Sequence, residues 1–213
     1  MYKILKLKKF IHYLIPSTIF WKFCNLLPFK KSNYLFTNSL NGYKNIYDNE
    51  IINSKFNTLL HIGCNTGSYG NHLNNILKNK TFYLNDINSS LFKYHKSLSN
   101  NFRFIKGDIV NINLPFSDII LCHTVLIYFD QKKLSKFLNK VILLNFKKLY
   151  IFEYFDDVYS FNYDNNIYIH SSIFLKNFFD KKRYNIDEIN INLDDKSDFQ
   201  KKHIKLYLIS KNI

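Results

Sequence analysis

The sequence predicts an α/β fold in which a mostly parallel sheet carries helices on both faces and ends in an antiparallel hairpin. From residue 56 onward, short and continuously apolar segments alternate with segments of helical periodicity. A glycine-containing turn follows the first apolar segment. The last two apolar segments are separated only by an acidic turn at 194–198, which we expect to leave no room for a helix. Strands covered on both faces are continuously apolar, and strand–helix alternation is typical of parallel sheets.

The individual elements follow from these patterns. The predicted strands are short apolar runs bounded by polar or turn residues, and they cover residues 58–62, 81–84, 102–105, 118–122, 149–152, 184–191 and 203–209. The predicted helices have apolar residues three and four positions apart, and they cover residues 69–77, 89–98, 131–144 and 171–179. The last two strands are expected to pair as a hairpin at one edge of the sheet.

Length and composition indicate one globular domain with an extension. The chain has 213 residues, of which 46% are hydrophobic and 22% charged, and it has only 5 Gly and 3 Pro. These values exclude a disordered, collagen-like or fibrous chain. The net charge of +14 comes almost wholly from Lys, because Arg occurs only as Arg103 and Arg183. Proteins that read nucleic-acid grooves favour Arg, so nucleic acid is the less favoured partner.

Residues 1–47 differ from the globular domain, which we assign to residues 48–213. They contain eight Lys and no acidic residue, and their longest charge-free run is residues 10–21. That run is shorter than the ~20 apolar residues of a membrane-spanning helix. We therefore expect either a helical cap on the domain or a basic amphipathic anchor on an anionic membrane surface. Three widely spaced cysteines without a CxxC pair fit a reducing compartment. We expect a cytoplasmic protein, peripheral at the inner membrane face if the extension is an anchor.

Polar sites follow each of the first three predicted strands. The turn after the first strand contains Gly63, Asn65 and Gly67. Such a turn lets backbone approach a ligand closely, and the helix after it offers backbone N–H groups. Asp86 ends the second strand, where a carboxylate can accept from both hydroxyls of a ribose. Asp108 comes just after the third strand.

This arrangement resembles the motifs of class I S-adenosylmethionine-dependent methyltransferases, which have a Rossmann-like seven-stranded sheet ending in such a hairpin. The resemblance implies S-adenosylmethionine as the cofactor. It also implies that His61 and the glycine turn bind the methionine part of the cofactor. Asp86 and Ile87 would then bind the ribose, and Asp108 and Ile109 would lie beside the adenine.

The chain departs from that family pattern at two positions. His61 stands where the family has an acidic residue, and Asn65 stands where it has the middle glycine. The departures leave open a protein that has kept the fold and lost the activity. Residues 65–70 also resemble a dinucleotide-binding turn, and Asp86 fits either reading. The final hairpin and Asp108 favour a methyltransferase over a nicotinamide-dependent oxidoreductase.

The fourth and fifth predicted strands end in side chains suited to methyl transfer. His123 follows the fourth strand and is expected to border both the cofactor and the transferred methyl group. A histidine titrates near neutrality, which suits a general base for a hydroxyl acceptor. Glu153 and Tyr154 are expected to face the same crevice, where Glu153 would bind a sugar hydroxyl or an amine. No cluster of residues has metal-ligand spacing, so we expect no metal site.

The acceptor is the least defined feature. Residues 56–180 are similar to small methyltransferases that accompany surface-sugar and glycan biosynthesis, which implies O- or N-methylation of a small molecule or glycan. An RNA methyltransferase that uses residues 1–47 as a basic arm is the alternative. An aromatic segment is expected to form an acceptor pocket or a lid, with His170 in a loop; it contains Tyr159, Phe161, Tyr163, Tyr168 and Phe174.

Overall fold

The computed structural model describes residues 44, 46–64, 67–87, 101–162, 167–191 and 197–211. The predicted helix at 89–98 and residues 1–43 of the predicted extension lie outside these residues. The strands are β1 (Thr58–Ile62), β2 (Thr81–Asp86), β3 (Phe102–Lys106), β4 (Ile119–His123), β5 (Lys148–Asp156), β6 (Ser160–Asn162), β7 (Ile167–Ser171), β8 (Tyr184–Ile189) and β9 (Ile204–Lys211). The helices are α4 (Ser68–Ile76), α5 (Gln131–Ile142), α6 (Ser172–Asp180) and α7 (Asp198–His203), with one 3-10 turn, η2 (Leu126–Tyr128). Residues 46–52 are also helical.

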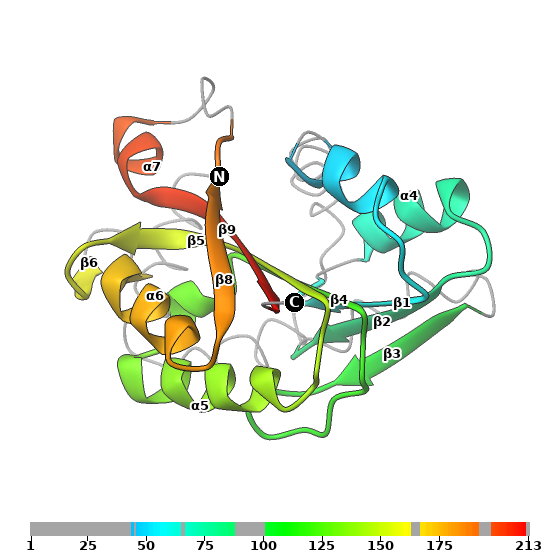
Figure 1. The fold of residues 1–213 in the computed structure, drawn as a ribbon, viewed down its shortest axis with the longest axis horizontal. Coiled ribbons are helices and arrows are strands. Elements are labelled where there is room, and N and C mark those ends of the chain that lie inside the picture. Colours follow the sequence, from blue (N-terminus) through cyan, green and yellow to red (C-terminus); the bar gives the residue numbers. More distant parts are fainter. Residues whose placement is uncertain are drawn as a thin grey trace, which may run out of the picture.

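The main sheet has the strand order β3-β2-β1-β4-β5-β9-β8 (Figure 1). β1 pairs in parallel with β2 and β4, and the parallel pairing continues to β3 on one side and β5 on the other. β9 runs antiparallel to both β5 and β8. The predicted fold, a mostly parallel α/β sheet that ends in an antiparallel hairpin, is confirmed.

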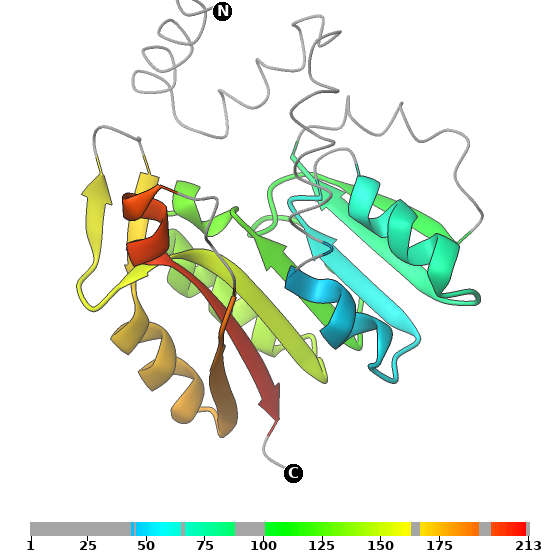
Figure 2. The same cartoon turned by 90° about the horizontal axis from the view of Figure 1, so that it is seen from above.

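Each face of the sheet has its own hydrophobic core. On one face, α5 and α6 pack against β1, β4 and β5, with Phe137, Leu138, Leu175 and Phe179 completely buried. On the other face, α4 and helical residues 46–52 pack against the same strands through Tyr47, Ile51, Tyr69 and Leu73. Figure 1 shows α4 above the parallel strands and α5 below them, and Figure 2 looks onto the sheet from the α4 side. Because successive residues of a strand point to opposite faces, each strand-end residue belongs to only one of the two cores.

The prediction of no helix before the last strand is wrong. The structure places α7 between β8 and β9. Ser197 caps this helix by accepting from the backbone N–H of Gln200, and the Gln200 side chain accepts from the backbone N–H of Ser197. This reciprocal capping box stabilises a helix of only 6 residues in a segment that lacks apolar periodicity.

A small antiparallel pair, β6 and β7, interrupts the expected run from β5 to α6. β6 pairs with β7 around Phe161 and Tyr168, and the end of β7 pairs in parallel with the end of β5. His170 lies in β7 and is completely buried, so its predicted loop position is wrong. Part of the aromatic segment thus forms strands; Tyr163 lies outside the described residues.

Candidate functional site

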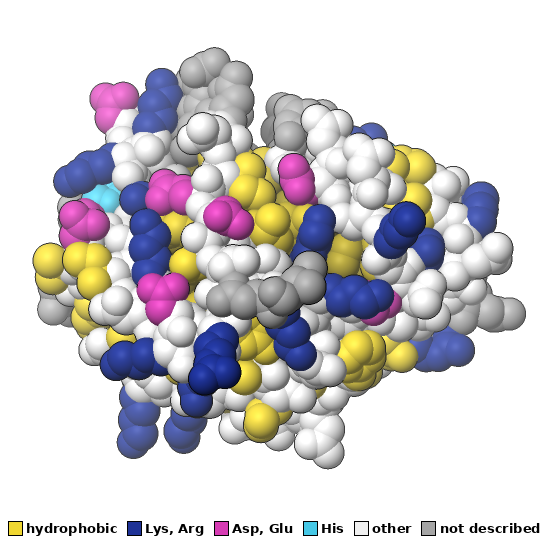
Figure 3. Space-filling model, in the orientation of Figure 1, with side chains coloured by type: hydrophobic (Ala, Val, Ile, Leu, Met, Phe, Trp, Pro, Cys, Tyr) yellow, Lys and Arg dark blue, Asp and Glu magenta, His cyan; other side chains and the backbone are white. Residues whose placement is uncertain are grey.

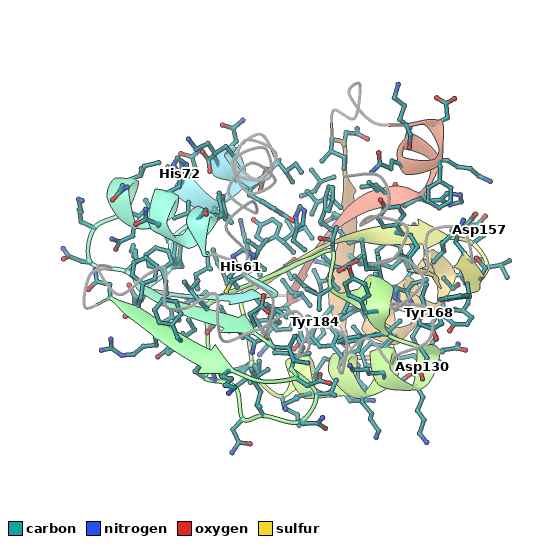
Figure 4. The ribbon with its side chains drawn as sticks, turned by 180° about the vertical axis from the view of Figure 1, so that it is seen from behind. His61, His72, Asp130, Asp157, Tyr168 and Tyr184 are labelled. Carbon is teal, nitrogen blue, oxygen red and sulfur yellow. The ribbon has the colours of Figure 1, made fainter. Side chains whose placement is uncertain are left out.

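The predicted site residues lie together at the carboxyl ends of the parallel strands. Ile62 at the end of β1 pairs with Asn85 in β2 and with Cys122 in β4. The glycine turn therefore follows β1 beside Asp86 and His123, which are the last residues of the neighbouring strands β2 and β4. In open α/β sheets this edge is where ligands bind. Figure 4 shows His61 in the middle of the sheet and His72 on α4 beside it.

The turn after β1 has the backbone shape that its glycines predict. Gly63 and Gly67 have φ angles of 67° and 72°, a region that favours glycine. The N–H of Gly67 donates to the carbonyl of Cys64 at 2.8 Å, which closes the turn. Gly67 is also the N-cap of α4, and no side chain caps that helix. Asn65 lies outside the described residues.

Asn85 holds the ends of β1, β2 and β3 together. Its side-chain Nδ2 donates to the carbonyls of Ile105 and Gly107, at 2.9 and 3.1 Å, and its own carbonyl accepts from Cys64 N–H at 2.9 Å. Asn85 is only 2% exposed. It is the residue before Asp86, so these bonds fix the strand end that carries the predicted ribose ligand. Ile87 follows directly and is half-buried.

The carboxylate of Asp108 already interacts with two other groups of the protein. Its Oδ2 lies 2.9 Å from Nζ of Lys133 on α5, and its Oδ1 accepts from the N–H of Val110 at 3.3 Å. Ile109 is buried beside it. An adenine amino group at this place would have to share the carboxylate with Lys133, so the predicted adenine contact stays a prediction.

His61 is a neutral, buried imidazole. It is 1% exposed, and its ring stands edge-on to Tyr69 with the centroids 6.3 Å apart. Burial lowers the pKa of His61 to about 3, because the interior disfavours the charged form. Where the family pattern has a carboxylate, this chain therefore presents an uncharged ring.

His123 is held on two sides. Its ring stacks on Phe152 of β5, with a centroid distance of 4.3 Å and an interplanar angle of 7°. Its Nδ1 lies 2.9 Å from the hydroxyl of Tyr47, whose ring stands edge-on to it. Burial, followed by the influence of His61, holds the pKa of His123 well below its usual range. At neutral pH the ring is therefore uncharged, as a proton acceptor must be.

Glu153 does not face this crevice, contrary to the sequence-based expectation. It is completely buried on the opposite face of the sheet. Its Oε1 accepts hydrogen bonds from the backbone N–H groups of Val125 and Leu126, the latter at 2.8 Å, and from the thiol of Cys122 at 3.9 Å. The physical reason is strand alternation: Phe152 points toward His123, so Glu153 points away. Burial raises the pKa of Glu153 to about 8.

His170 holds the same turn from the other side. Its Nε2 donates to the carbonyl of Leu126 at 2.7 Å, so the backbone N–H and the carbonyl of Leu126 are both bonded to buried side chains. Tyr154 returns to the face of His123, where its hydroxyl accepts from Gln200 at 3.3 Å and its ring lies against Phe199 of α7. Its predicted contact with an acceptor stays a prediction.

Sequence reasoning missed Tyr47 and Asp48 as parts of the site. Tyr47 is completely buried against the sheet, although it was assigned to the extension. Asp48 accepts from the hydroxyl of Tyr69 at 3.0 Å and pairs with Nε2 of His72 at 2.7 Å. The predicted boundary between residues 47 and 48 thus falls within a helix, at the point where that helix contacts the site.

The described residues contain neither a metal-binding cluster nor a membrane-spanning helix. No group of three His, Cys, Asp or Glu side chains within them could hold a metal ion. No helix formed by these residues is long and apolar enough to cross a membrane.

The fold is that of S-adenosylmethionine-dependent methyltransferases. Human N-acetylserotonin methyltransferase, solved with S-adenosylmethionine, is similar over 74% of this chain and 48% of its own, at 13% identity and a TM-score of 0.54. The chain thus spans about half the length of that enzyme. No protein-family profile and no curated protein matches the sequence.

Two bacterial structures are similar over most of both chains. The 1,6-didemethyltoxoflavin-N1-methyltransferase of Burkholderia thailandensis has a TM-score of 0.59 at 11% identity, over 84% of this chain and 86% of that one. The magnesium protoporphyrin IX methyltransferase of Synechocystis has a TM-score of 0.57 at 13% identity, over 82% and 79%. At these identities the likeness establishes the fold.

Proposed function

We propose that the protein is a methyltransferase that uses S-adenosylmethionine to methylate an oxygen or nitrogen of a small molecule. The main support for the proposal is that Asn85 ties the carboxyl ends of β1, β2 and β3 together. There, a turn with two left-handed glycines lies beside Asp86, and Asn85 fixes the strand end that carries this acid. The similar solved enzymes are named for small-molecule acceptors, namely N-acetylserotonin, magnesium protoporphyrin IX and 1,6-didemethyltoxoflavin.

The residues present fit the cofactor at these positions. The glycine turn leads into α4, whose N-terminus has no side-chain cap and can therefore meet a polar or anionic group. Asp86 supplies a carboxylate for the ribose hydroxyls. His61 offers a neutral ring where a carboxylate is usual, so any contact with the methionine ammonium would be a hydrogen bond to an uncharged acceptor and not an ion pair. S-adenosylmethionine supplies, when bound, a methyl group on a cationic sulfur that needs no further activation.

The remaining work of the protein is to hold the acceptor and to remove a proton where one must leave. We assign proton removal from a hydroxyl acceptor to His123. The stack on Phe152 and the bond to Tyr47 fix the plane of its ring, and alignment of the reacting groups is a large part of such catalysis. A nitrogen acceptor would need no such base if it binds unprotonated.

The finer proposal for the acceptor is a sugar or glycan hydroxyl, supported by the sequence likeness to enzymes of surface-sugar synthesis. Burial of Glu153 removes the carboxylate that was expected to bind such a hydroxyl. Recognition would then rest on Tyr154 and His123. RNA is the less favoured acceptor, because the basic excess is almost wholly Lys, whereas Arg makes the bidentate contacts typical of nucleic-acid recognition. Figure 3 shows the Asp and Glu side chains of one face mainly at its upper left, with Lys and Arg spread over the rest.

A calorimetric titration with S-adenosylhomocysteine, with NADH in parallel, tests the proposal. We expect micromolar binding of S-adenosylhomocysteine alone. Asp86→Ala should weaken it by about tenfold or more, because charge-assisted hydrogen bonds are lost. Asp187→Ala, on exposed β8, is the matched control and should bind as the wild type does. Binding of NADH instead would favour an oxidoreductase, and binding of neither would favour a methyltransferase-fold protein without activity.

The role of residues 1–47 is tested separately. We propose that this basic segment rests on an anionic membrane face. The full-length protein should then sediment with vesicles containing phosphatidylserine, and not with vesicles of phosphatidylcholine alone. Salt-sensitive binding of RNA without vesicle binding would favour the RNA methyltransferase.

A further inference from the structure

Tyr47 reaches the site from outside the parallel sheet. It lies in helical residues 46–52, and its hydroxyl is 2.9 Å from Nδ1 of His123, which is 76 residues later in the chain. Tyr47 is completely buried against the face of the sheet. A buried tyrosine hydroxyl is costly unless it has a hydrogen-bond partner. The bond to His123 therefore offsets the cost of burying the Tyr47 hydroxyl.

The ring of Tyr47 cannot shift easily. It lies edge-on to Tyr150 at 6.1 Å and tilted against Tyr69 at 5.9 Å. The next residue, Asp48, bonds to both Tyr69 and His72 of α4. The backbone at 47–48 is thus tied to the helix that follows the glycine turn, while the Tyr47 side chain is tied to β4.

The far side of His123 is equally constrained. The ring of Phe152 stacks on it, and the carbonyl of Phe152 accepts from the N–H of Thr124 at 2.9 Å. Thr124 has a φ of 50°, which a β-branched residue adopts only when surrounding contacts impose it. The structure therefore fixes where His123 lies, and Tyr47 is the contact that meets one of its two nitrogens.

We propose that Tyr47 is a positioning residue for His123, whose hydroxyl oxygen accepts a hydrogen bond from Nδ1–H and thereby keeps the lone pair on Nε2. A hydroxyl acceptor would transfer its proton to this lone pair. The resulting imidazolium would have N–H groups at both nitrogens, and Nδ1–H would still donate to Tyr47. The nitrogen that carries the proton in a neutral histidine is set by the bond that the other nitrogen makes. This role of Tyr47 rests on the proposed methyltransferase function.

The tautomer can be measured without any acceptor. Long-range proton–nitrogen NMR spectra of the full-length protein distinguish a protonated from an unprotonated ring nitrogen. The chain has seven histidines, and the signals lost in His123→Asn identify those of His123. We expect the wild type to carry its proton on Nδ1. Tyr47→Phe, which keeps the ring and removes only the hydroxyl, should lose this preference and show a substantial Nε2–H population.

Tyr150→Phe is the matched control. Tyr150 is also completely buried and contacts Tyr47 edge-on, but within the described structure it has no hydrogen bond to His123. It should leave the His123 tautomer unchanged. A wild-type proton on Nε2, an unchanged tautomer in Tyr47→Phe, or an equal change in Tyr150→Phe would each overturn the proposal.

Binding of S-adenosylhomocysteine separates this inference from the proposed function. We expect the Tyr47→Phe protein to bind it within about twofold of the wild type, because Tyr47 acts on the proton acceptor rather than on the donor site. If the wild type fails to bind it, the methyltransferase function fails, whatever the tautomer. If the wild type binds and only Tyr47→Phe loses binding, Tyr47 supports the donor site instead, and the positioning role is wrong.

Discussion

The carboxylate oxygen Oε1 of Glu153 accepts a hydrogen bond from the backbone N–H of Leu126 at 2.8 Å. Through this bond, a side chain of β5 holds the turn that directly follows His123 at the end of β4. His170 bonds to the carbonyl of the same residue. Two buried side chains on one face of the sheet thus fix the chain next to a site on the other face.

The raised pKa of Glu153 predicts a stability that falls as pH rises. The folded carboxyl keeps its proton up to a pKa of about 8, whereas the unfolded one releases it near pH 4.5. The proton therefore stabilises the fold fully below about pH 4.5, and this contribution is lost progressively up to about pH 8. Urea unfolding between pH 5 and 8 should show a slope of up to about 1.4 kcal/mol per pH unit from this group.

Glu153→Gln should remove that part of the pH dependence, because an amide does not titrate in this range. Glu188→Gln, on exposed β8, should leave it in place and is the control. A wild-type stability that is level or rising across this range, with Glu153→Gln unchanged relative to it, would contradict a protonated Glu153.

The lowered pKa of His61 predicts a stability that falls as the pH is lowered below 6.5. The buried ring titrates at a pKa of about 3, against 6.5 for an exposed histidine. The neutral ring contributes to the free energy of unfolding in full above pH 6.5, and this contribution is lost as the pH falls toward 3. His61→Gln should therefore lose less stability than the wild type between pH 6.5 and 4, as measured by thermal unfolding. Parallel losses in the two proteins would show that His61 is not buried in its neutral form.

The strands could be predicted from the sequence because buried strands consist of consecutive apolar residues. β4 was expected at 118–122 and lies at Ile119–His123, with its first four residues buried. The helix α7 could not be predicted from apolar periodicity, since its residues are mostly charged or polar. Its capping box, Ser197 and Gln200 at a spacing of three, was the available signal.

The site was only partly predictable, because its decisive contacts join distant parts of the chain. The end-of-strand positions of Asp86 and His123 follow from local pattern. The Tyr47–His123 bond spans 76 residues, and nothing near Tyr47 indicates it. The burial of Glu153 depends on which face of β5 it occupies, and a strand-end acid between aromatic residues gives no alternation from which to read this.

The close contact between Gly63 and Val125 predicts a specific rescue. A Cβ on residue 63 would lie 2.1 Å from Cγ2 of Val125, and the φ of Gly63 is 67°. Gly63→Ala should therefore destabilise the fold by about 2–4 kcal/mol, from overpacking and from the left-handed backbone together. Adding Val125→Ala should recover the overpacking part alone, which a double-mutant cycle measures. If the two substitutions add without coupling, the side chains at 63 and 125 do not meet.

The two bonds from Asn85 predict that this side chain is essential to the shape of the site. Asn85→Ala would leave the half-buried carbonyls of Ile105 and Gly107 without this donor, at a cost of about 2–3 kcal/mol for the two bonds together. It should also weaken S-adenosylhomocysteine binding, because the strand end that carries Asp86 is no longer tied to β3. Asn53→Ala is the matched control: Asn53 makes the same kind of side-chain bond to a carbonyl, to Asn49 at 2.8 Å, but is exposed. It should cost less than about 0.5 kcal/mol and spare binding. Equal losses of stability in the two variants, or full ligand affinity in Asn85→Ala, would show that Asn85 does not hold the site together.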